Sequence, residues 1–310
     1  MNLFTPFAGT RSEPAPTRPA PPRAALCLPS PDPQLVDAVR ERVTTGLYVP
    51  GSRLTLTELR DATGCDADAL RPALDQLAAT GIVKTVRGRW RVVDDLPAGH
   101  AARRAAQLLG TVIGQGGYPP DAGLPGRRAL ARILLAPADV VTQALALLAD
   151  QHLLYFSGSS QPRVVNPPSG RRRTVWRERM YAIARKHPTR PRQSAPFNRP
   201  DIQAARDAAI NRWRQGTCLP DKDMTRQERR QGEALERLAS NACARAVRQL
   251  PHEHPGLRQA AVRVLACWDL PTEDVPLHER LYRNTVLATA LADLADEIAA
   301  PSRAPQYPRR

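Results

Sequence analysis

The chain has 310 residues, a formal net charge of +15 and a sequence pI near 10.6, and only three of its 45 basic residues are lysines. This length accommodates two or three domains, and the charge favours a polyanionic partner such as nucleic acid. Five scattered cysteines without C-x-x-C spacing argue against a disulfide framework and a cysteine-based zinc site. With neither a signal peptide nor a window near the about 18 to 20 apolar residues of a membrane helix, the expected location is the cytoplasm, associated with the nucleoid.

Arginine and alanine are also common in proteins of GC-rich genomes. That bias explains part of the arginine excess, but it does not explain the positive net charge.

Residues 1–33 include RSEPAPTRPAPPR, which is rich in proline and poor in aliphatic residues, so a disordered arm is expected there. From Pro33 onward, apolar residues follow helical spacing at Leu35, Val36, Val39 and Val43. The stretch GLYVPG then predicts a turn, and a short helix is expected near residues 57–62.

A third helix is expected from about Asp66, whose side chain can cap it or accept a hydrogen bond from a cytosine. Its apolar face consists of Leu70, Ala73, Leu74 and Leu77. Pro72 removes one helical hydrogen bond, so a late start or a distorted turn is expected. Gly81 ends the helix, and IVKTV-RG-RWRVV alternates like a hairpin. Three helices and a hairpin predict a winged helix-turn-helix.

A second segment repeats this order. Leu108, Leu109, Val112 and Ile113 form the first apolar face, and LLYF-SGSSQP-RVV is the expected hairpin. Matching positions keep a constant offset on each side of one insertion, and the pairs are Tyr48 with Tyr118, Pro50 with Pro120, Leu54 with Leu124, Leu59 with Leu130, Leu70 with Val141, Ala73 with Ala144, Leu74 with Leu145 and Leu77 with Leu148. The sequence therefore predicts two tandem copies of one domain.

Four amphipathic helices are expected at 201–215, 225–249, 256–269 and 277–300, the last with Leu287, Leu291, Leu294 and Ile298 at helical spacing. The predicted fold is mainly α: two tandem winged helix-turn-helix domains, each of three helices and a β-hairpin, before a small all-helical C-terminal domain. The expected boundaries are an arm at 1–33, winged helices at 34–97 and 101–168, a basic linker at 169–199, the helical domain at 200–300 and a tail at 301–310.

Both copies resemble the DNA-binding domain of GntR-type bacterial transcription regulators over roughly residues 34–94 and 101–166. The resemblance is carried in the first copy by Gly46, Tyr48, Pro50, Gly51 and Leu54, and in the second by Gly117, Tyr118, Pro120, Leu124, Pro125, Arg128, Leu130 and Ala131. It implies that the third helix enters the major groove, that the second helix and the wing contact the DNA backbone, and that a dimer binds a palindromic site.

The family's third helix opens S-R-x-x-V-R-x-A-L, whereas the first copy has DADALRPAL. Arg71 keeps the second arginine, and Ala67 replaces the first between Asp66 and Asp68. The implied DNA contacts of this copy are Thr57, Asp66, Asp68, Arg71 and, at the wing tip, Arg87, Gly88 and Arg89. A solvated turn would also tolerate these arginines.

The second copy has PADVVTQAL and keeps neither arginine, so Thr142 and Gln143 are its remaining contacts from the third helix. Its second helix adds Arg127, Arg128 and Arg132 for phosphate. A degenerate copy that serves as a packing surface is the alternative.

Residues 171–192 carry nine basic side chains and one acidic one. Arg171, Arg172 and Arg173 begin either a basic arm along the DNA backbone or a linker helix that buries Trp176, Met180 and Ile183.

The predicted function is a sequence-selective transcription regulator, in which the first winged helix reads double-stranded DNA and the second, with the linker, adds backbone contacts. The alternative is a plasmid or mobile-element protein for replication, partition or transfer. The C-terminal domain would form a homodimer, bind an effector of unknown class or recruit a partner. Enzyme motifs, a cofactor and a membrane contact are not expected. No metal is expected either, although His252, His254 and His278 are the candidate ligands by analogy with the family's metal-binding members.

Overall fold

The computed structural model describes residues 31–97, 99–156, 161–165, 175–185, 197–248 and 255–300. The predictions for residues 1–30, for Arg171, Arg172 and Arg173, for His252 and His254, and for the tail at 301–310 lie outside these residues.

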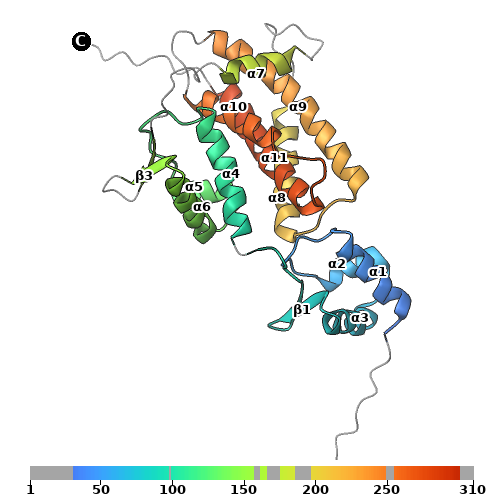
Figure 1. Cartoon of the computed structure of the whole chain (residues 1–310). Helices are drawn as coiled ribbons and strands as arrows, with labels where there is room; N and C mark the ends of the chain where they lie inside the picture. Colours follow the sequence, from blue (N-terminus) through green and yellow to red (C-terminus); the bar gives the residue numbers. More distant parts are fainter. Residues whose placement is uncertain are drawn as a thin grey trace, which may run out of the picture. The chain divides into compact units, whose positions relative to one another are not determined.

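The first segment consists of α1 (Pro33–Thr44), α2 (Leu56–Thr63), α3 (Ala67–Ala79) and an antiparallel hairpin of β1 (Val83–Val86) and β2 (Arg89–Val92) (Figure 1). The expected faces of α1 and α3 are buried, and they join the hairpin's Val83 and Val92 in one core. Arg87 and Gly88 form the two-residue turn with φ of 53° and 71°, as a type I′ hairpin requires. The order is that of a winged helix-turn-helix.

The helices of this segment begin with different caps. Thr55 accepts a hydrogen bond from the Glu58 amide at 3.3 Å and donates one to the Glu58 carboxylate at 2.9 Å, so side chains hold the start of α2. Asp66 occupies the N-cap position of α3, but its side chain makes no capping hydrogen bond. The prediction that Asp66 caps through its side chain was therefore wrong. Its backbone carbonyl begins the helix instead, accepting from Ala69 and Leu70 at 3.2 and 3.1 Å, while the side chain is exposed.

Residues 99–165 repeat the order of elements. They form α4 (His100–Gly114), α5 (Arg127–Ile133), α6 (Ala138–Asp150), and an antiparallel pair of β3 (Leu154–Phe156) and β4 (Pro162–Val164). The backbone hydrogen bonds repeat as well. Gly51 and Leu54 donate to the carbonyls of Val92 and Trp90 at 3.2 and 3.0 Å. Correspondingly, Asp121 and Leu124 donate to Val164 and Pro162 at 3.0 and 3.0 Å.

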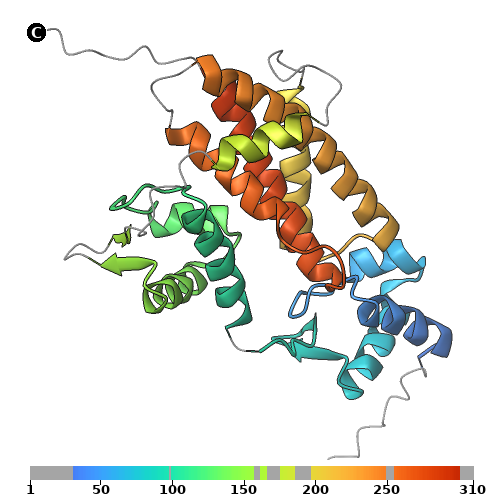
Figure 2. The ribbon, with the colours of Figure 1, turned by 45° about the horizontal axis from the view of Figure 1, so that its top comes forward.

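The last part of the chain is helical. α7 (Val175–Ala184) packs on α9 (Asp221–Arg248) and on α10 (Pro255–Trp268), while α8 (Arg199–Gln215), α9 and α10 pack around α11 (Leu277–Ala299) (Figure 2). The prediction that α11 is amphipathic was wrong, because its residues from Leu281 to Ala295 are all buried apart from the half-buried Thr289 and Asp293.

Polar side chains inside α11 are satisfied locally, which allows that burial. Arg283 donates to the carbonyls of Leu270 and Trp268 at 3.0 and 3.2 Å, at the end of α10. Its guanidinium also lies over the Trp268 ring, 5.1 Å from the centroid. Burial without such partners would be costly for a cation, so these contacts fix the helix in the centre of the bundle.

The second segment and the helical bundle share one hydrophobic core. Buried residues from α4, α5 and α6 form a continuous cluster with those of α7, α9, α10 and α11, whereas the first segment has a separate cluster. The Tyr282 hydroxyl donates to the Leu134 carbonyl at 3.1 Å within the shared core. The second segment is therefore built into the bundle through side-chain packing.

The first segment meets the bundle at a short backbone pairing. The Cys218 amide donates to the Leu47 carbonyl at 2.6 Å, and the Val49 amide donates to the Gly216 carbonyl at 2.7 Å. The Thr217 hydroxyl adds a hydrogen bond to the Glu58 carboxylate at 2.8 Å. The turn between α1 and α2 thus takes main-chain partners from the loop between α8 and α9.

No single helix within the described ranges is long and apolar enough to cross a membrane. Only when taken together do α5 and α6 have the length and apolar composition of a membrane span, and the two helices meet at a bend of 96°.

Candidate nucleic-acid interface

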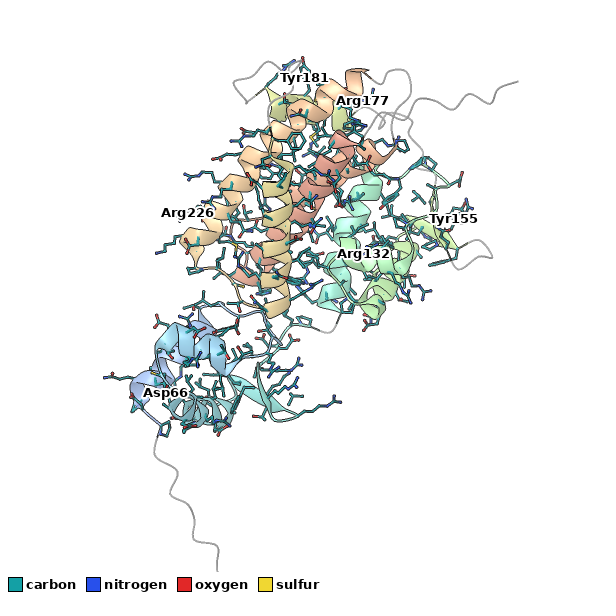
Figure 3. All side chains as sticks on the ribbon, turned by 180° about the vertical axis from the view of Figure 1, so that it is seen from behind. Asp66, Arg132, Tyr155, Arg177, Tyr181 and Arg226 are labelled. Atoms are coloured by element: carbon teal, nitrogen blue, oxygen red, sulfur yellow. The ribbon has the colours of Figure 1, made fainter. Side chains whose placement is uncertain are left out.

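The exposed face of α3 carries the side chains predicted to read bases. Leu70, Ala73, Leu74 and Leu77 are fully buried, which turns the remaining positions outward. Asp68 and Arg71 lie on that outer face, one helical turn apart. Asp66, which is labelled in Figure 3, precedes them. α3 is continuous from Ala67 although Pro72 lies inside it. The helix therefore neither starts late nor breaks, and its first two turns present Asp68 and Arg71 to solvent.

The hairpin adds a second exposed surface beside α3. The Trp90 indole donates to the Asp75 carboxylate of α3 at 3.1 Å and so links the two elements. In the register of the hairpin, Lys84 lies opposite Arg91, and Val86 lies opposite Arg89, so these four side chains share one face. The backbone of Arg53 forms an isolated antiparallel β-bridge with that of Arg91, so the Arg53 side chain extends this row of cations.

We call the exposed set Arg53, Lys84, Arg89 and Arg91 the cationic wing face. Arg91 also donates to the Gly51 carbonyl at 3.2 Å, which orients its guanidinium. Sequence reasoning predicted Arg87, Gly88 and Arg89 at the tip, all three of which are exposed, but it missed Arg53, Lys84 and Arg91. The alternation of the hairpin could have found Lys84 and Arg91, since residues two apart share a face.

The second hairpin is less cationic at the matching positions. Tyr155 replaces Lys84, Arg163 replaces Arg91, and Gly123 replaces Arg53. Tyr155 donates to the Asp121 carboxylate at 3.0 Å, and this hydrogen bond raises the pKa of the phenol. Phe156 remains more than half exposed. This hairpin therefore offers aromatic surface where the first offers charge.

The residues in the second segment that were predicted to contact DNA are exposed to solvent, and one of them also lines a cavity beside the bundle. Arg127, Arg128, Thr142 and Gln143 are exposed, although the Thr142 hydroxyl donates to the Ala138 carbonyl of its own helix at 2.9 Å. Arg132 lines a cavity together with Asp293 of α11. Burial raises the pKa of the Asp293 carboxyl despite the nearby positive charge of arginines that include Arg132. Thr57 is exposed at the start of α2.

The basic linker is described only over α7. Trp176 and Met180 are buried and Ile183 is half-buried, as the linker-helix alternative expects. Arg179 pairs with Asp269 through two hydrogen bonds of 2.9 and 2.6 Å, and Arg185 lies over the Tyr181 ring at 4.8 Å. Part of the linker's positive charge is thus engaged within the protein.

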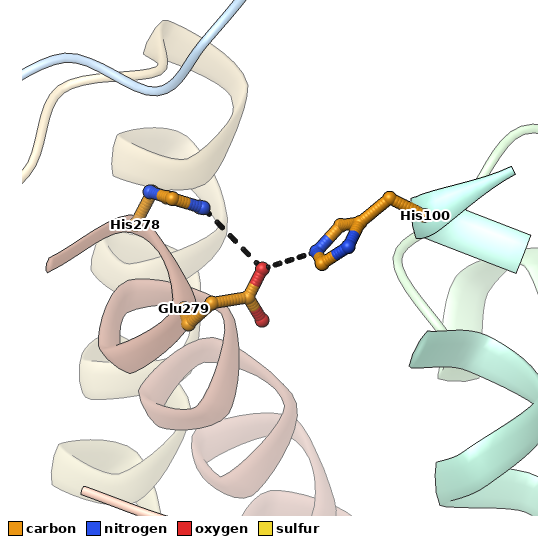
Figure 4. Close-up of side chains that lie close together, drawn as sticks. All are labelled: His100, His278 and Glu279. Atoms are coloured by element: carbon orange, nitrogen blue, oxygen red, sulfur yellow. Dashed lines mark hydrogen bonds and ion pairs between the residues drawn. The ribbon is translucent and has the colours of Figure 1, made fainter. Parts of the chain in front are cut away.

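One cluster has the residue types of a metal site. His100 at the start of α4 lies beside His278 and Glu279 at the start of α11, with potential ligand atoms within 4.8 Å of one another (Figure 4). The same Glu279 oxygen accepts from His100 at 2.8 Å and from Arg104 at 2.9 Å. Because a guanidinium already occupies this oxygen, the cluster forms an ionic junction between α4 and α11.

Residues 32–93 match the family model described as bacterial regulatory proteins, gntR family. The comparison with curated proteins found no match. The match spans α1 to β2, the helices and hairpin that carry Arg71 and the cationic wing face. A GntR-type winged-helix domain at this position supports a DNA-binding transcription regulator.

Proposed function

We propose that the protein is a sequence-selective transcription regulator whose first winged helix selects the DNA sequence. α3 would enter the major groove, where Arg71 can donate two hydrogen bonds to guanine and Asp66 or Asp68 can accept one from cytosine. Thr57, the wing tip and the cationic wing face would contact the backbone. The single observation that carries this proposal is that, in the region that matches the family, α3 is joined through Trp90 to a hairpin whose other face carries a row of four cations.

We further propose that residues 99–165 are a second copy of this domain. Support comes from the buried state of its matched core residues, from Tyr118 to Leu148, and from the equivalent hydrogen bonds of the two extended segments. Arg127 and Arg128 would hold phosphates, while Thr142 and Gln143 offer weaker contacts from α6. The C-terminal helices would form a homodimer, and a basic arm from Arg171 to Arg173 would contact the DNA backbone.

Genome-wide immunoprecipitation of bound DNA, followed by anisotropy titration on the enriched sequence, tests the function. Enrichment of promoter sites supports a regulator, whereas enrichment confined to iterated repeats at a replication or transfer origin would support the plasmid alternative. Absence of DNA binding even at low salt would refute the proposal, since phosphate contacts strengthen as salt falls.

The second copy has its own test. Replacing Arg127 and Arg128 together with glutamine should weaken binding to all sequences equally and lower the slope of log K against log salt by about 2. An unchanged slope would assign residues 99–165 to packing alone. The matched control replaces Lys222 and Arg229 on α9, which removes the same charge far along the chain from the proposed contacts.

A further inference from the structure

A cavity of about 650 Å³ lies between α8 and α9, with α11 beneath it. Ala288 and Leu291 of α11 line its floor, and both are almost completely buried. Ile202 and Ala205 of α8 and Ala234 of α9 extend this apolar lining. The volume lies within the range of about 300 to 1,000 Å³ that small-molecule sites occupy. The cavity can therefore enclose the apolar body of a compact organic molecule.

One buried hydrogen-bond acceptor in the lining has no partner among the described residues. Gln231 of α9 is only 7% exposed, and its Nε2 donates to the Asn284 carbonyl at 2.7 Å. That bond fixes the orientation of the amide, because only the nitrogen can donate. The Gln231 Oε1 atom is buried and makes no hydrogen bond with any described residue. Such an acceptor is unfavourable unless a donor reaches it, so a ligand with a hydroxyl or N–H group would satisfy it.

The charged lining is predominantly positive. Four arginines, Arg212, Arg226, Arg230 and Arg237, face two aspartates, Asp201 and Asp223. Arg226 lies 3.8 Å from Asp223, and it projects from α9 in Figure 3. Arg230 and Arg237 are exposed, and neither side chain forms an ion pair with a described carboxylate. The cavity thus offers two unneutralised guanidinium groups, which suit a carboxylate, sulfonate or phosphate.

We infer that this cavity binds a compact organic anion that has an apolar body and one hydrogen-bond donor. The apolar floor takes the body, Gln231 Oε1 accepts from the donor, and Arg230 and Arg237 pair with the anionic group. The site lies within the helical bundle, so the inference does not depend on the proposed reading of DNA.

The test uses the full chain without DNA and 1-anilinonaphthalene-8-sulfonate, a fluorescent probe with an anionic group, aromatic rings and an N–H donor. We expect saturable fluorescence well below the unfolding temperature. The double substitution Arg230→Gln with Arg237→Gln should weaken binding about fivefold, as expected for two solvent-exposed ion pairs. A single-charge control is Arg229→Gln, which removes an exposed arginine of α9 that does not line the cavity and should leave binding within about twofold.

Competition defines the ligand class. We expect 6-hydroxy-2-naphthoate to displace the probe at a concentration about 3 to 10 times lower than 2-naphthoate, which lacks the donor. The variant Gln231→Leu should remove that difference, and the ratio of the two competitors remains informative even if the variant is less stable. The cation 2-naphthylmethylammonium should not compete in this range. Equal displacement by cation and anion, or equal weakening by Arg229→Gln and the double substitution, would overturn the inference.

Discussion

Arg71 is the residue on which the proposed sequence selectivity depends. It keeps the second arginine expected from the family's pattern, and it lies exposed on α3 between two acidic positions, Asp68 and Asp75. Asp75 is engaged by Trp90 at 3.1 Å. Arg71 is therefore the exposed cation of α3 that can donate to a base edge.

Replacement of Arg71 by alanine should lower affinity for the enriched DNA site by about 1 to 3 kcal/mol, while binding to random DNA changes little. Anisotropy titrations with both duplexes provide the measurement. An equal loss on both duplexes would reassign Arg71 to phosphate. The control Arg40→Ala removes a cation from α1 that already pairs with Asp37 and should leave both affinities nearly unchanged.

Glu279 is the second residue with a distinct role. Burial raises the pKa of its carboxyl, but hydrogen bonds from His278 and His100 and the charge of Arg104 outweigh burial and lower that pKa to about 2 from an ordinary value of 4.5. Because the pKa is depressed in the folded state, ionised Glu279 stabilises the fold above pH 4.5, and this contribution is lost as the pH falls toward 2.

The variant Glu279→Gln should reduce the free energy of unfolding by about 2 kcal/mol at neutral pH, because Arg104 loses a charged acceptor. Urea denaturation of both proteins across pH 7 to 3 measures this. The difference between them should shrink in the acidic part of that range. A difference that stays constant would show that the carboxylate's charge is not what joins α4 to α11.

Among the elements, the hairpin of the first segment is the strongest candidate for contact with the phosphate backbone of DNA. Its cationic wing face presents Arg53, Lys84, Arg89 and Arg91 on one side, while Val83 and Val92 on the other side enter the core. One face of the hairpin therefore packs into the core while the other presents the charges to solvent, so the cations take no place in the core.

Changing Lys84, Arg89 and Arg91 together to glutamine should lower the salt slope of DNA binding by about 2 to 3, since each phosphate that the protein no longer neutralises removes about 0.9. The loss of affinity should be similar on all sequences. The control changes Lys222, Arg226 and Arg229 on α9 and removes the same net charge. If both triple variants lower the slope equally, overall charge rather than the wing is responsible.

Local patterns were sufficient to predict most elements. The i, i+3, i+4 and i+7 spacing of Leu70, Ala73, Leu74 and Leu77 identified the buried face of α3, and the fixed offset to Val141, Ala144, Leu145 and Leu148 identified the corresponding face of α6. Such spacing depends only on residues within one helix. It therefore needs no knowledge of the tertiary fold.

Long-range contacts could not be predicted in the same way. Nothing in the local pattern shows that Glu279 meets His100, which is 179 positions away, or that Gln231 meets Asn284. The burial of α11 was missed because Arg283, Asn284 and Thr285 give the helix polar positions outside its leucine stripe. Carbonyl groups at the end of α10 satisfy Arg283, and this arrangement is visible only in three dimensions.

For the whole molecule, the pairing between Leu47–Val49 and Gly216–Cys218 is the point at which the first segment meets the bundle. Gly216 has φ of +75°, ends α8 in the left-handed region, and would place a Cβ only 2.3 Å from the Ser52 Cβ. Gly64 also ends a helix in this region, at φ of +71°, but has open space around it. Substitution of Gly64 therefore tests the cost of a left-handed backbone alone, whereas substitution of Gly216 adds a steric clash with Ser52.

Gly64→Ala should cost about 1 kcal/mol of stability, as a left-handed alanine does. Gly216→Ala should cost more and should also increase amide hydrogen exchange at Val49 and Cys218, because Ser52 must move away. Amide hydrogen exchange at Val49 and Cys218 would be measured in both variants by mass spectrometry. Equal exchange at these amides in the two variants would show that the pairing does not hold the first segment to the bundle.

This pairing also bears on how the protein is synthesised. The turn at Leu47–Val49 leaves the ribosome about 170 residues before its main-chain partners, an interval of roughly 10 to 30 s at an elongation rate of about 5 to 20 residues per second. During that time the nascent first domain depends on its own cluster of 13 buried residues. The proposed DNA-binding surface is therefore complete on the growing chain before the helical bundle has been synthesised.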